Sequence, residues 1–222
     1  MTLSLVARCS RTGMLGAAVT TSSIAVGSRC PHAKAGVGAV LTQHRTDPRL
    51  GPLAIDLLSR GFSAEQAMAA VVAATPHRDW RQLAIIDRDG RTAAFSGTFV
   101  APEKDEAHGT DCVAIANIVR SATVPRAMVA AFDRDPSAPL AERLIAALAA
   151  GEAAGGEFVP VTSAALRVVH RESFPYVDLR VDDHPSPIAE LTRLWEAYRP
   201  EADPYVMRAV DPDRATRPGE NA

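Results

Sequence analysis

The chain has 222 residues, of which 47% are hydrophobic, and a formal net charge of −2 at pH 7. A chain of this length can fold as one domain that buries about 70% of the surface its unfolded form exposes. The near-neutral charge gives no electrostatic footprint for nucleic acid, and no apolar run approaches the roughly 18 residues of a membrane span. Three cysteines without CxxC spacing indicate neither a disulfide framework nor a cysteine zinc site, and we expect no cofactor.

The first residues predict a β-hairpin. Residues 2–8 (TLSLVAR) form a β-rich run, 10–13 (SRTG) a polar turn with a glycine, and 14–19 (MLGAAV) the returning strand. The polar residues of the turn come too early for a secretory signal. We therefore expect a soluble cytoplasmic protein, with neither nucleic acid nor a membrane as a partner.

Groups of strands and pairs of helices follow in the rest of the chain. Strands are predicted over 35–43, 112–119, 163–172 and 176–183, and a hairpin over 82–97 with its turn at 88–90. Helices are predicted over 51–61, 63–74, 125–132, 140–150 and 188–198. Ser63 and Gln66 have the spacing of a capping box, and Gly151 is expected to end the fourth helix. The polar segment 102–111 is expected to be a loop.

This order of elements predicts the fold class. Grouped strands separated by helix pairs indicate an α+β protein, a four-layer αββα sandwich with two antiparallel sheets between helical layers. The expected domain covers residues 1–199. Residues 200–222 form a C-terminal extension that has too few apolar residues to pack from about 211 onward, so we expect it to be disordered there.

Thr2 is the first candidate catalytic residue. An initiator methionine before a small residue is normally removed, which would leave Thr2 with a free α-amine. That amine has an ordinary pKa of about 7.7–8.0, so it can act as a base toward the adjacent hydroxyl near neutral pH. A threonine activated by its own α-amine is a known nucleophile for acyl transfer. The competing interpretation is an inert strand start.

A specific resemblance is carried by the stretches TLSLVAR, AVGSRCPHAKAGVGAVLTQ, WRQLAIIDRDGRTAAFSG and PYVDLRVDDHPSPIAEL. The chain resembles, over roughly residues 2–194, a bacterial family catalogued as domain of unknown function 1028 and assigned to the N-terminal-nucleophile (Ntn) hydrolases. The resemblance implies the αββα sandwich and hydrolysis by an N-terminal residue, but no substrate. The chain departs from the family pattern at 102–108 (PEKDEAH), where a Trp-Ala-Gly-like loop is frequent, and at Ile115-Ala116-Asn117, where Gln-Gly-Asn is frequent.

Five further residues are candidates for the chemistry around Thr2. Lys34 precedes a strand, as the catalytic lysine of proteasome β-type subunits does, and its charge would stabilise a threonine alkoxide. The end of the glycine-rich strand is where an oxyanion donor would be sought, which makes Thr42, Gln43 and His44 candidates. Asn117 is a candidate pocket donor. The alternatives are a solvated lysine, an ordinary strand end and a helix cap.

The densest cluster of ionisable residues lies late in the chain. Asp178, Arg180 and Asp182 alternate on one face of a predicted strand, followed by Asp183 and His184. Arg180, Asp182 and His184 could bind a substrate carboxylate, or the Asp182-Asp183-His184 run could hold a metal. An ion-paired strand surface is the favoured interpretation, so no metal ligands are assigned.

Three functions remain in competition. The preferred one is hydrolysis of an amide bond in a small molecule or peptide through a threonyl ester on Thr2, assisted by Lys34. The second is a metal-dependent hydrolase that uses the Asp182-Asp183-His184 run. The third is a non-catalytic binding or assembly protein on an Ntn sandwich. A homo-oligomer is left open.

Overall fold

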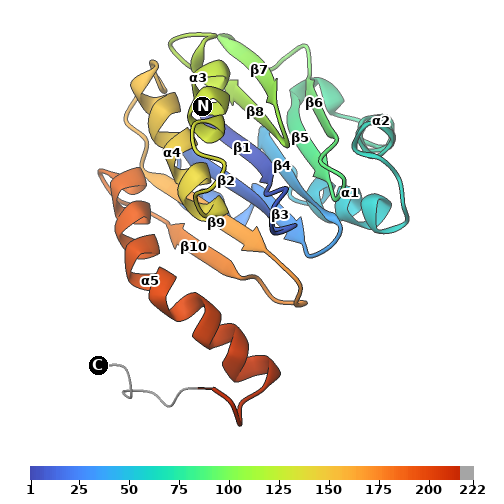
Figure 1. Cartoon of the computed structure of the whole chain (residues 1–222). Helices are drawn as coiled ribbons and strands as arrows, with labels where there is room; N and C mark the ends of the chain where they lie inside the picture. The colour runs from blue at the N-terminus through green and yellow to red at the C-terminus, as the bar shows by residue number, and fades with distance from the viewer. Residues whose placement is uncertain (216–222) are drawn as a thin grey trace.

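The computed structural model describes residues 1–215, which fold into two antiparallel sheets covered by helices on both outer faces (Figure 1). The six-stranded sheet has the order β10-β9-β2-β1-β8-β7, and the four-stranded sheet has the order β3-β4-β5-β6. The strands are β1 Thr2–Arg8, β2 Leu15–Thr21, β3 Pro31–Lys34, β4 Gly38–His44, β5 Arg81–Asp87, β6 Thr92–Ser96, β7 Lys104–Gly109, β8 Cys112–Asn117, β9 Ser163–Val169 and β10 Val177–Val181.

Five α-helices within the described residues form the outer layers. They are α1 Leu50–Ser59, α2 Ala64–Ala74, α3 Val124–Asp133, α4 Leu140–Ala153 and α5 Pro187–Val210. Two short 3-10 helices, η1 Val26–Ser28 and η2 Arg78–Trp80, precede β3 and β5. No described helix combines the length and the apolar character that a membrane crossing would require.

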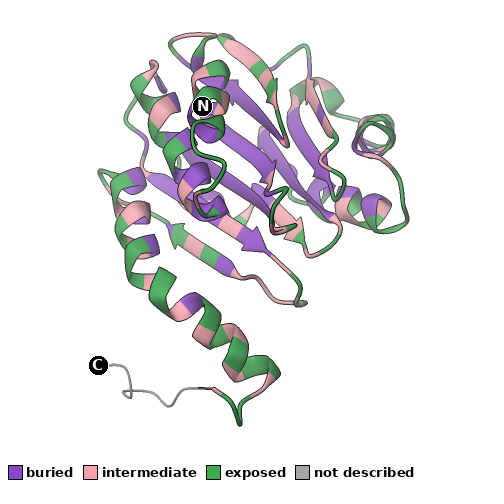
Figure 2. Ribbon diagram, in the orientation of Figure 1, coloured by how far each residue is buried: buried purple, intermediate pink, exposed green. Residues whose placement is uncertain are grey.

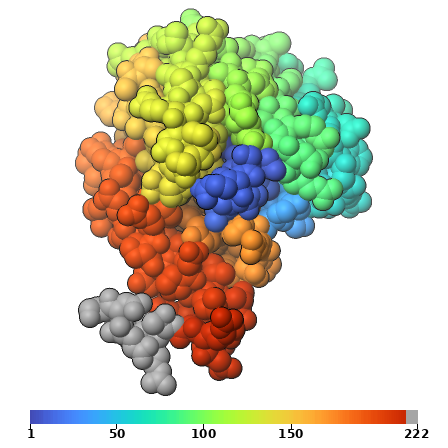
Figure 3. All heavy atoms as spheres, viewed as in Figure 1, coloured from blue at the N-terminus to red at the C-terminus, as the bar shows by residue number. Residues whose placement is uncertain are grey.

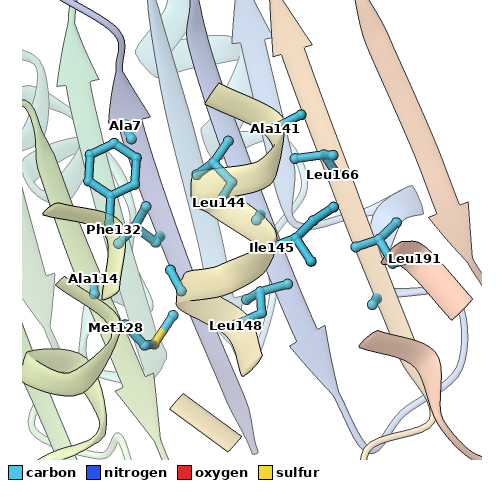
Figure 4. Packing of buried hydrophobic residues seen from close by; sticks show 14 of the residues in the cluster. Ala7, Ala114, Met128, Phe132, Ala141, Leu144, Ile145, Leu148, Leu166 and Leu191 are labelled. Carbon is cyan, nitrogen blue, oxygen red and sulfur yellow. The ribbon is translucent and has the colours of Figure 1, made fainter. Parts of the chain in front are cut away.

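Alternation along β1 shows how the layers are assembled. Leu3 and Leu5 face α3 and α4, where Phe132 and Leu144 fill the core (Figure 4). Val6 points the other way, into the apolar layer between the two sheets. Residues two apart on a strand share a face, so the even-numbered side chains of β1 lie between the sheets.

The second sheet completes the four layers. Leu41 of β4 and Ile86 of β5 face the first sheet, whereas Val40 and Ile85 pack against α1 and α2. Both sheets are therefore buried on two faces, and the helices are exposed on their outer sides (Figure 2). The predicted αββα sandwich is confirmed.

Several predicted boundaries are confirmed, and others are wrong for physical reasons. The strand over 2–8 and the capping box of α2 are found as expected. The segment predicted as a polar loop contains β7, an edge strand that pairs with β8. None of its residues is fully buried and only Ala107 is apolar, so the strand lacks the alternation by which it could be recognised. Gly151 does not end α4. It lies inside the helix, where a Cβ would approach Leu3 and Met128 to 2.8 Å.

The last helix is longer than the sequence pattern predicts. Helix α5 continues past Tyr198 to Val210 and carries Pro200 and Pro204 inside it, so the first part of the expected C-terminal extension is helical. Its far part stands out from the body of the molecule (Figure 3). Ala202 is fully buried, and the Tyr176 hydroxyl donates to Asp203 over 3.0 Å, so tertiary contacts hold this part. Of the stretch predicted to be disordered, residues 216–222 lie outside the described residues.

Candidate active site

Thr2 is the first residue of β1 and is only 5% exposed. It pairs with Asn117 of β8, so the ladder holds it in place. Because Val6 of the same strand faces the second sheet, the side chains of Ser4 and Thr2 also lie between the sheets. The nucleophile candidate therefore lies between the sheets and is shielded from water.

A chain of buried amide groups lies next to Thr2 and joins the two sheets. The Ser4 hydroxyl donates to Gln43 Oε1 over 2.7 Å. Gln43 Nε2 and Asn117 Nδ2 both donate to Gln82 Oε1, over 2.7 and 2.8 Å. All four residues are fully buried. We call Ser4, Gln43, Gln82 and Asn117 the amide network. It fixes four side chains in one arrangement at low dielectric, although Asn117 Oδ1 is buried without a partner among the described residues.

The hydroxyl of Thr2 contacts a carbonyl group in this structure. Thr2 Oγ1 donates to the carbonyl oxygen of Met1, and Thr21 Oγ1 of the neighbouring strand β2 donates to the same oxygen. The two hydroxyl oxygens are 3.4 Å apart. A carbonyl group is thus held by two hydroxyl donors, one of which belongs to the candidate nucleophile.

Glu157 is a buried carboxylate near the start of the chain. One of its oxygens accepts a hydrogen bond from the Ser22 amide over 3.0 Å, and the other is buried without a partner among the described residues. Burial raises the pKa of Glu157, and the positive charge of the Met1 amine works against this rise. Burial in turn lowers the pKa of the Met1 amine, opposed by the charge of Glu157. The two groups therefore favour each other's charged form.

Two basic residues border the same region. Lys104 pairs with Asn117 in the ladder of β7 and β8, so it lies on the face of the sheet that carries Thr2. Its ammonium donates to the carbonyl oxygen of Gly97 over 2.7 Å. His44 has a left-handed backbone with φ 69 and shares a hydrogen bond of 2.9 Å with the Trp80 carbonyl oxygen. Burial lowers the pKa of His44, and the charges of Lys104 and the Met1 amine lower it further.

Not every residue predicted from the sequence is found beside Thr2. Gln43, Asn117 and His44 are near it, but the expected proximity of Lys34 is wrong. Lys34 lies at the turn between β3 and β4, pairs with Gly38 and donates to Ser59 over 3.1 Å. Gln43 is five residues further along β4, which places Lys34 on the order of 16 Å from the amide network.

Thr42 is also misplaced by the sequence prediction. Its side chain points to the face of β4 opposite Gln43, because neighbouring residues of a strand alternate. There its hydroxyl donates to the Asp47 carbonyl oxygen over 3.3 Å. Thr42 therefore cannot donate to a group bound at Thr2.

The charged residues of β10 form ion pairs with one another and with β9. Arg180 pairs with Asp182 over 2.9 Å, and Asp178 pairs with Arg167 of β9 over 2.7 Å. His184 Nδ1 accepts a hydrogen bond from the Ser186 amide. No group of three or more His, Cys, Asp or Glu side chains placed to hold a metal occurs within residues 1–215. The geometry thus gives no support to the metal-dependent alternative.

Five further residues of the candidate site were not predicted from the sequence: Ser4, Thr21, Gln82, Lys104 and Glu157. Gln82 and Ser4 lie in segments with the ordinary alternation of a β-strand. The one signal that they give in the sequence is that a polar residue stands where the alternation predicts a buried side chain. Lys104 lies in the segment predicted as a loop, and Glu157 follows two glycines without any local motif.

Comparison with known proteins places the chain in a family. Residues 2–191 match a family of unknown function, DUF1028. The chain belongs to this family. A crystal structure of a DUF1028 protein from Silicibacter pomeroyi is 32% identical, with a TM-score of 0.83, and the match covers 89% of this chain and 85% of that one. Anbu (ancestral beta-subunit) from Yersinia bercovieri is 13% identical, with a TM-score of 0.41 over 90% and 95% of the two chains. No curated protein matches this DUF1028 chain.

Proposed function

We propose that this DUF1028 protein is an Ntn-type hydrolase that cleaves an amide bond of a small molecule or peptide, after cleavage of the Met1–Thr2 bond frees the amine of Thr2. The supporting observation is the contact between the Thr2 hydroxyl and the Met1 carbonyl oxygen at the buried end of β1. The contact supports the proposal because it places a carbonyl oxygen beside this hydroxyl. In the proposed enzyme, the departure of Met1 opens the space in which the substrate carbonyl lies.

The reaction proceeds through two acyl transfers. The Thr2 oxygen attacks the carbonyl carbon of the substrate amide, and the α-amine of Thr2 accepts the hydroxyl proton. The C–N bond then breaks, the leaving amine takes that proton, and a threonyl ester remains. Water attacks the ester while the α-amine accepts a proton from it. The carboxylic acid then leaves, and the Thr2 hydroxyl recovers its proton.

The surrounding groups have roles that follow from their positions. Thr21, which donates to the Met1 carbonyl oxygen here, would donate to the oxyanion of each tetrahedral intermediate. Glu157 would orient the amine of Thr2 and stabilise its protonated form. Lys104, rather than Lys34, supplies the cation on the face of the sheet that carries Thr2. The amide network holds Asn117 beside β1, which keeps the nucleophile in one geometry.

The first test is the N-terminus itself. Intact mass spectrometry of the purified protein should show a chain that begins at Thr2. Full hydrolytic activity in a chain that retains Met1 would exclude the mechanism, because the α-amine of Thr2 would still be an amide.

The second test compares two buried threonines. Thr2→Ala should lower kcat for a panel of small N-acyl amides by about 10³ or more, because the nucleophile is lost. Its free energy of unfolding should fall by about 1 kcal/mol, since a buried hydroxyl is removed. Thr20→Ala is the matched control, because Thr20 is equally buried and donates to the Ser163 carbonyl oxygen instead. Wild-type activity in both variants would exclude Thr2 as the nucleophile, whereas a wild-type protein that cleaves no member of the panel would support the non-catalytic alternative.

A further inference from the structure

A group of exposed aromatic and basic side chains borders the candidate site. Trp80 and Phe99 are 38% and 56% exposed, whereas the second tryptophan, Trp195, is 4% exposed. His44 and Arg45 lie against Trp80. We call His44, Arg45, Trp80 and Phe99 the Trp80 wall. Large aromatic side chains that cluster at the surface frequently mark a binding site.

The Trp80 wall is ordered before any ligand binds. The rings of His44 and Trp80 are parallel within 9°, with centroids 6.3 Å apart, and Phe99 contacts Trp80 with centroids 5.1 Å apart. The Phe99 amide donates to the Asp79 carbonyl oxygen over 2.8 Å, which ties the loop after β6 to η2. Gly97 permits this close approach, because a Cβ there would come within 2.4 Å of the Asp79 carbonyl oxygen. Such preorganisation reduces the entropy that binding would cost.

Arg45 gives the Trp80 wall a positive charge. Its guanidinium carbon is 5.0 Å from the centroid of the Trp80 ring. Within residues 1–215, no carboxylate forms an ion pair with Arg45. The nearby Asp47 is already held by Arg49 over 2.8 Å and by Arg81 over 3.6 Å. Arg45, Trp80 and Arg81 also line an open hollow of about 370 Å³, together with His77.

The Trp80 wall lies next to the amide network. Gln43, which accepts the hydrogen bond from Ser4, directly precedes His44 and Arg45. The loop that carries Phe99 is tied to the same place, because Lys104 donates to the Gly97 carbonyl oxygen over 2.7 Å. Arg45 is two residues from Gln43, so at about 3.3 Å per residue its backbone is at most about 7 Å from this member of the amide network.

We propose that the Trp80 wall binds the part of the substrate that carries a planar ring and a carboxylate, with the ring against the exposed surface of Trp80 and Phe99 and the carboxylate on Arg45. The substrate class is then an acylated aromatic amino acid or a short peptide that ends in one. This inference rests on the proposed function, because it assigns the amide carbonyl of the same molecule to Thr2. An Arg–carboxylate contact beside an aromatic face combines charge, direction and stacking, and so selects for both groups together.

The test measures binding without catalysis. The Thr2→Ala protein is titrated by calorimetry with N-acetylglycyl-phenylalanine, with its uncharged C-terminal amide, and with N-acetylglycyl-leucine. The free acid should bind with a Kd about tenfold lower than those of the other two peptides. The amide lacks the ion pair with Arg45, and the leucine peptide lacks the aromatic ring. The free acid should also quench the fluorescence of the exposed Trp80.

Second-site variants in the Thr2→Ala background locate the effect. Arg45→Ala should abolish the preference for the free acid over the amide, and Arg45→Lys should restore part of it. Trp80→Leu should abolish the preference for phenylalanine over leucine. Arg88→Ala is the matched control, because Arg88 is an exposed arginine beyond the opposite end of β5 and should change neither preference.

The outcomes separate this inference from the proposed function. Equal binding of acid and amide, absence of binding by the acid, or a preference that persists in Arg45→Ala would each overturn the subsite. A preference that depends on Arg45, in a wild-type protein that cleaves neither peptide, would support the subsite and count against the hydrolase. Cleavage that is lost in Thr2→Ala, but is equal for the acid and the amide and unchanged in Arg45→Ala, would support the hydrolase and overturn the subsite.

Discussion

Strand β5 carries a buried polar residue near each end, and the two residues are held by very different parts of the chain. Gln82 accepts hydrogen bonds from Gln43 and Asn117, and donates to Ser96 and to the Ala116 carbonyl oxygen. Its partners lie on β4, β6 and β8, so these hydrogen bonds form only when the two sheets have packed against each other. The Gln82 end of the strand is the one that borders Thr2.

Asp87, at the other end of β5, finds most of its partners within four residues, and only the Ala64 amide comes from 23 residues away. Its carboxylate accepts hydrogen bonds from the amides of Ala64, Asp89 and Arg91, and pairs with the Arg91 guanidinium over 2.8 Å. These residues belong to the turn after β5 and to the first turn of α2. The two buried polar residues of β5 thus have different kinds of partner. Partners that are close in the sequence stabilise a turn, whereas partners from distant segments form the candidate site.

Substitution of Gln82 should have the largest effect on stability. Gln82→Met keeps the volume but leaves Gln43 Nε2, Asn117 Nδ2 and the Ala116 carbonyl oxygen without their partner. The free energy of unfolding, measured by urea denaturation, should fall by about 2–4 kcal/mol. Activity per folded molecule should fall as well, because the network positions β8 beside Thr2. Ser96→Ala removes one partner only and should cost about 1 kcal/mol. Equal effects of the two changes would contradict the idea of a network.

Asp87→Asn tests the local cluster and should cost less. Burial works against ionisation of Asp87, but hydrogen bonds from Arg91 and the backbone amides hold its pKa below the ordinary value. The variant should lose about 1–3 kcal/mol at pH 7, without any change in activity, because Asp87 is remote from Thr2.

The stabilisation by Asp87 should depend on pH with a defined sign. A carboxylate with a depressed pKa stabilises the fold above its ordinary pKa of about 4 and loses this contribution as the pH falls through the folded-state value. The difference in unfolding free energy between wild type and Asp87→Asn should therefore shrink below about pH 4. A difference that stays constant from pH 7 to pH 3 would show that the hydrogen bonds do not depend on the charge.

Arg180→Ala should have the smallest effect and sets the baseline for an exposed ion pair. The side chains of Arg180 and Asp182 are 38% and 53% exposed, so water screens their interaction. The free energy of unfolding should fall by less than about 1 kcal/mol, and kcat/KM should not change. A large increase in KM with unchanged unfolding would show that Arg180 binds substrate after all.

The sequence by itself determines the elements whose signals are local. The strand from Thr2, the hairpin of β5 and β6, and the capping box of α2 depend on residues within a few positions of one another, and they are found where the pattern predicts them. The grouping of strands between helix pairs was enough to indicate the αββα sandwich. Thr2 could be selected because a methionine precedes it, and Asn117 because it is the residue that remains of the Gln-Gly-Asn pattern.

The tertiary structure alone decided which polar residues meet. Lys34 and Lys104 are both compatible with a role beside Thr2 in the sequence, but strand pairing places Lys104 on the face of Thr2 and Lys34 at a distant turn. Ser4, Gln43 and Gln82 look like isolated polar residues until the two sheets are stacked. Their hydrogen bonds depend on the register between sheets, which arises from the packing of the whole core and leaves no local trace in the chain.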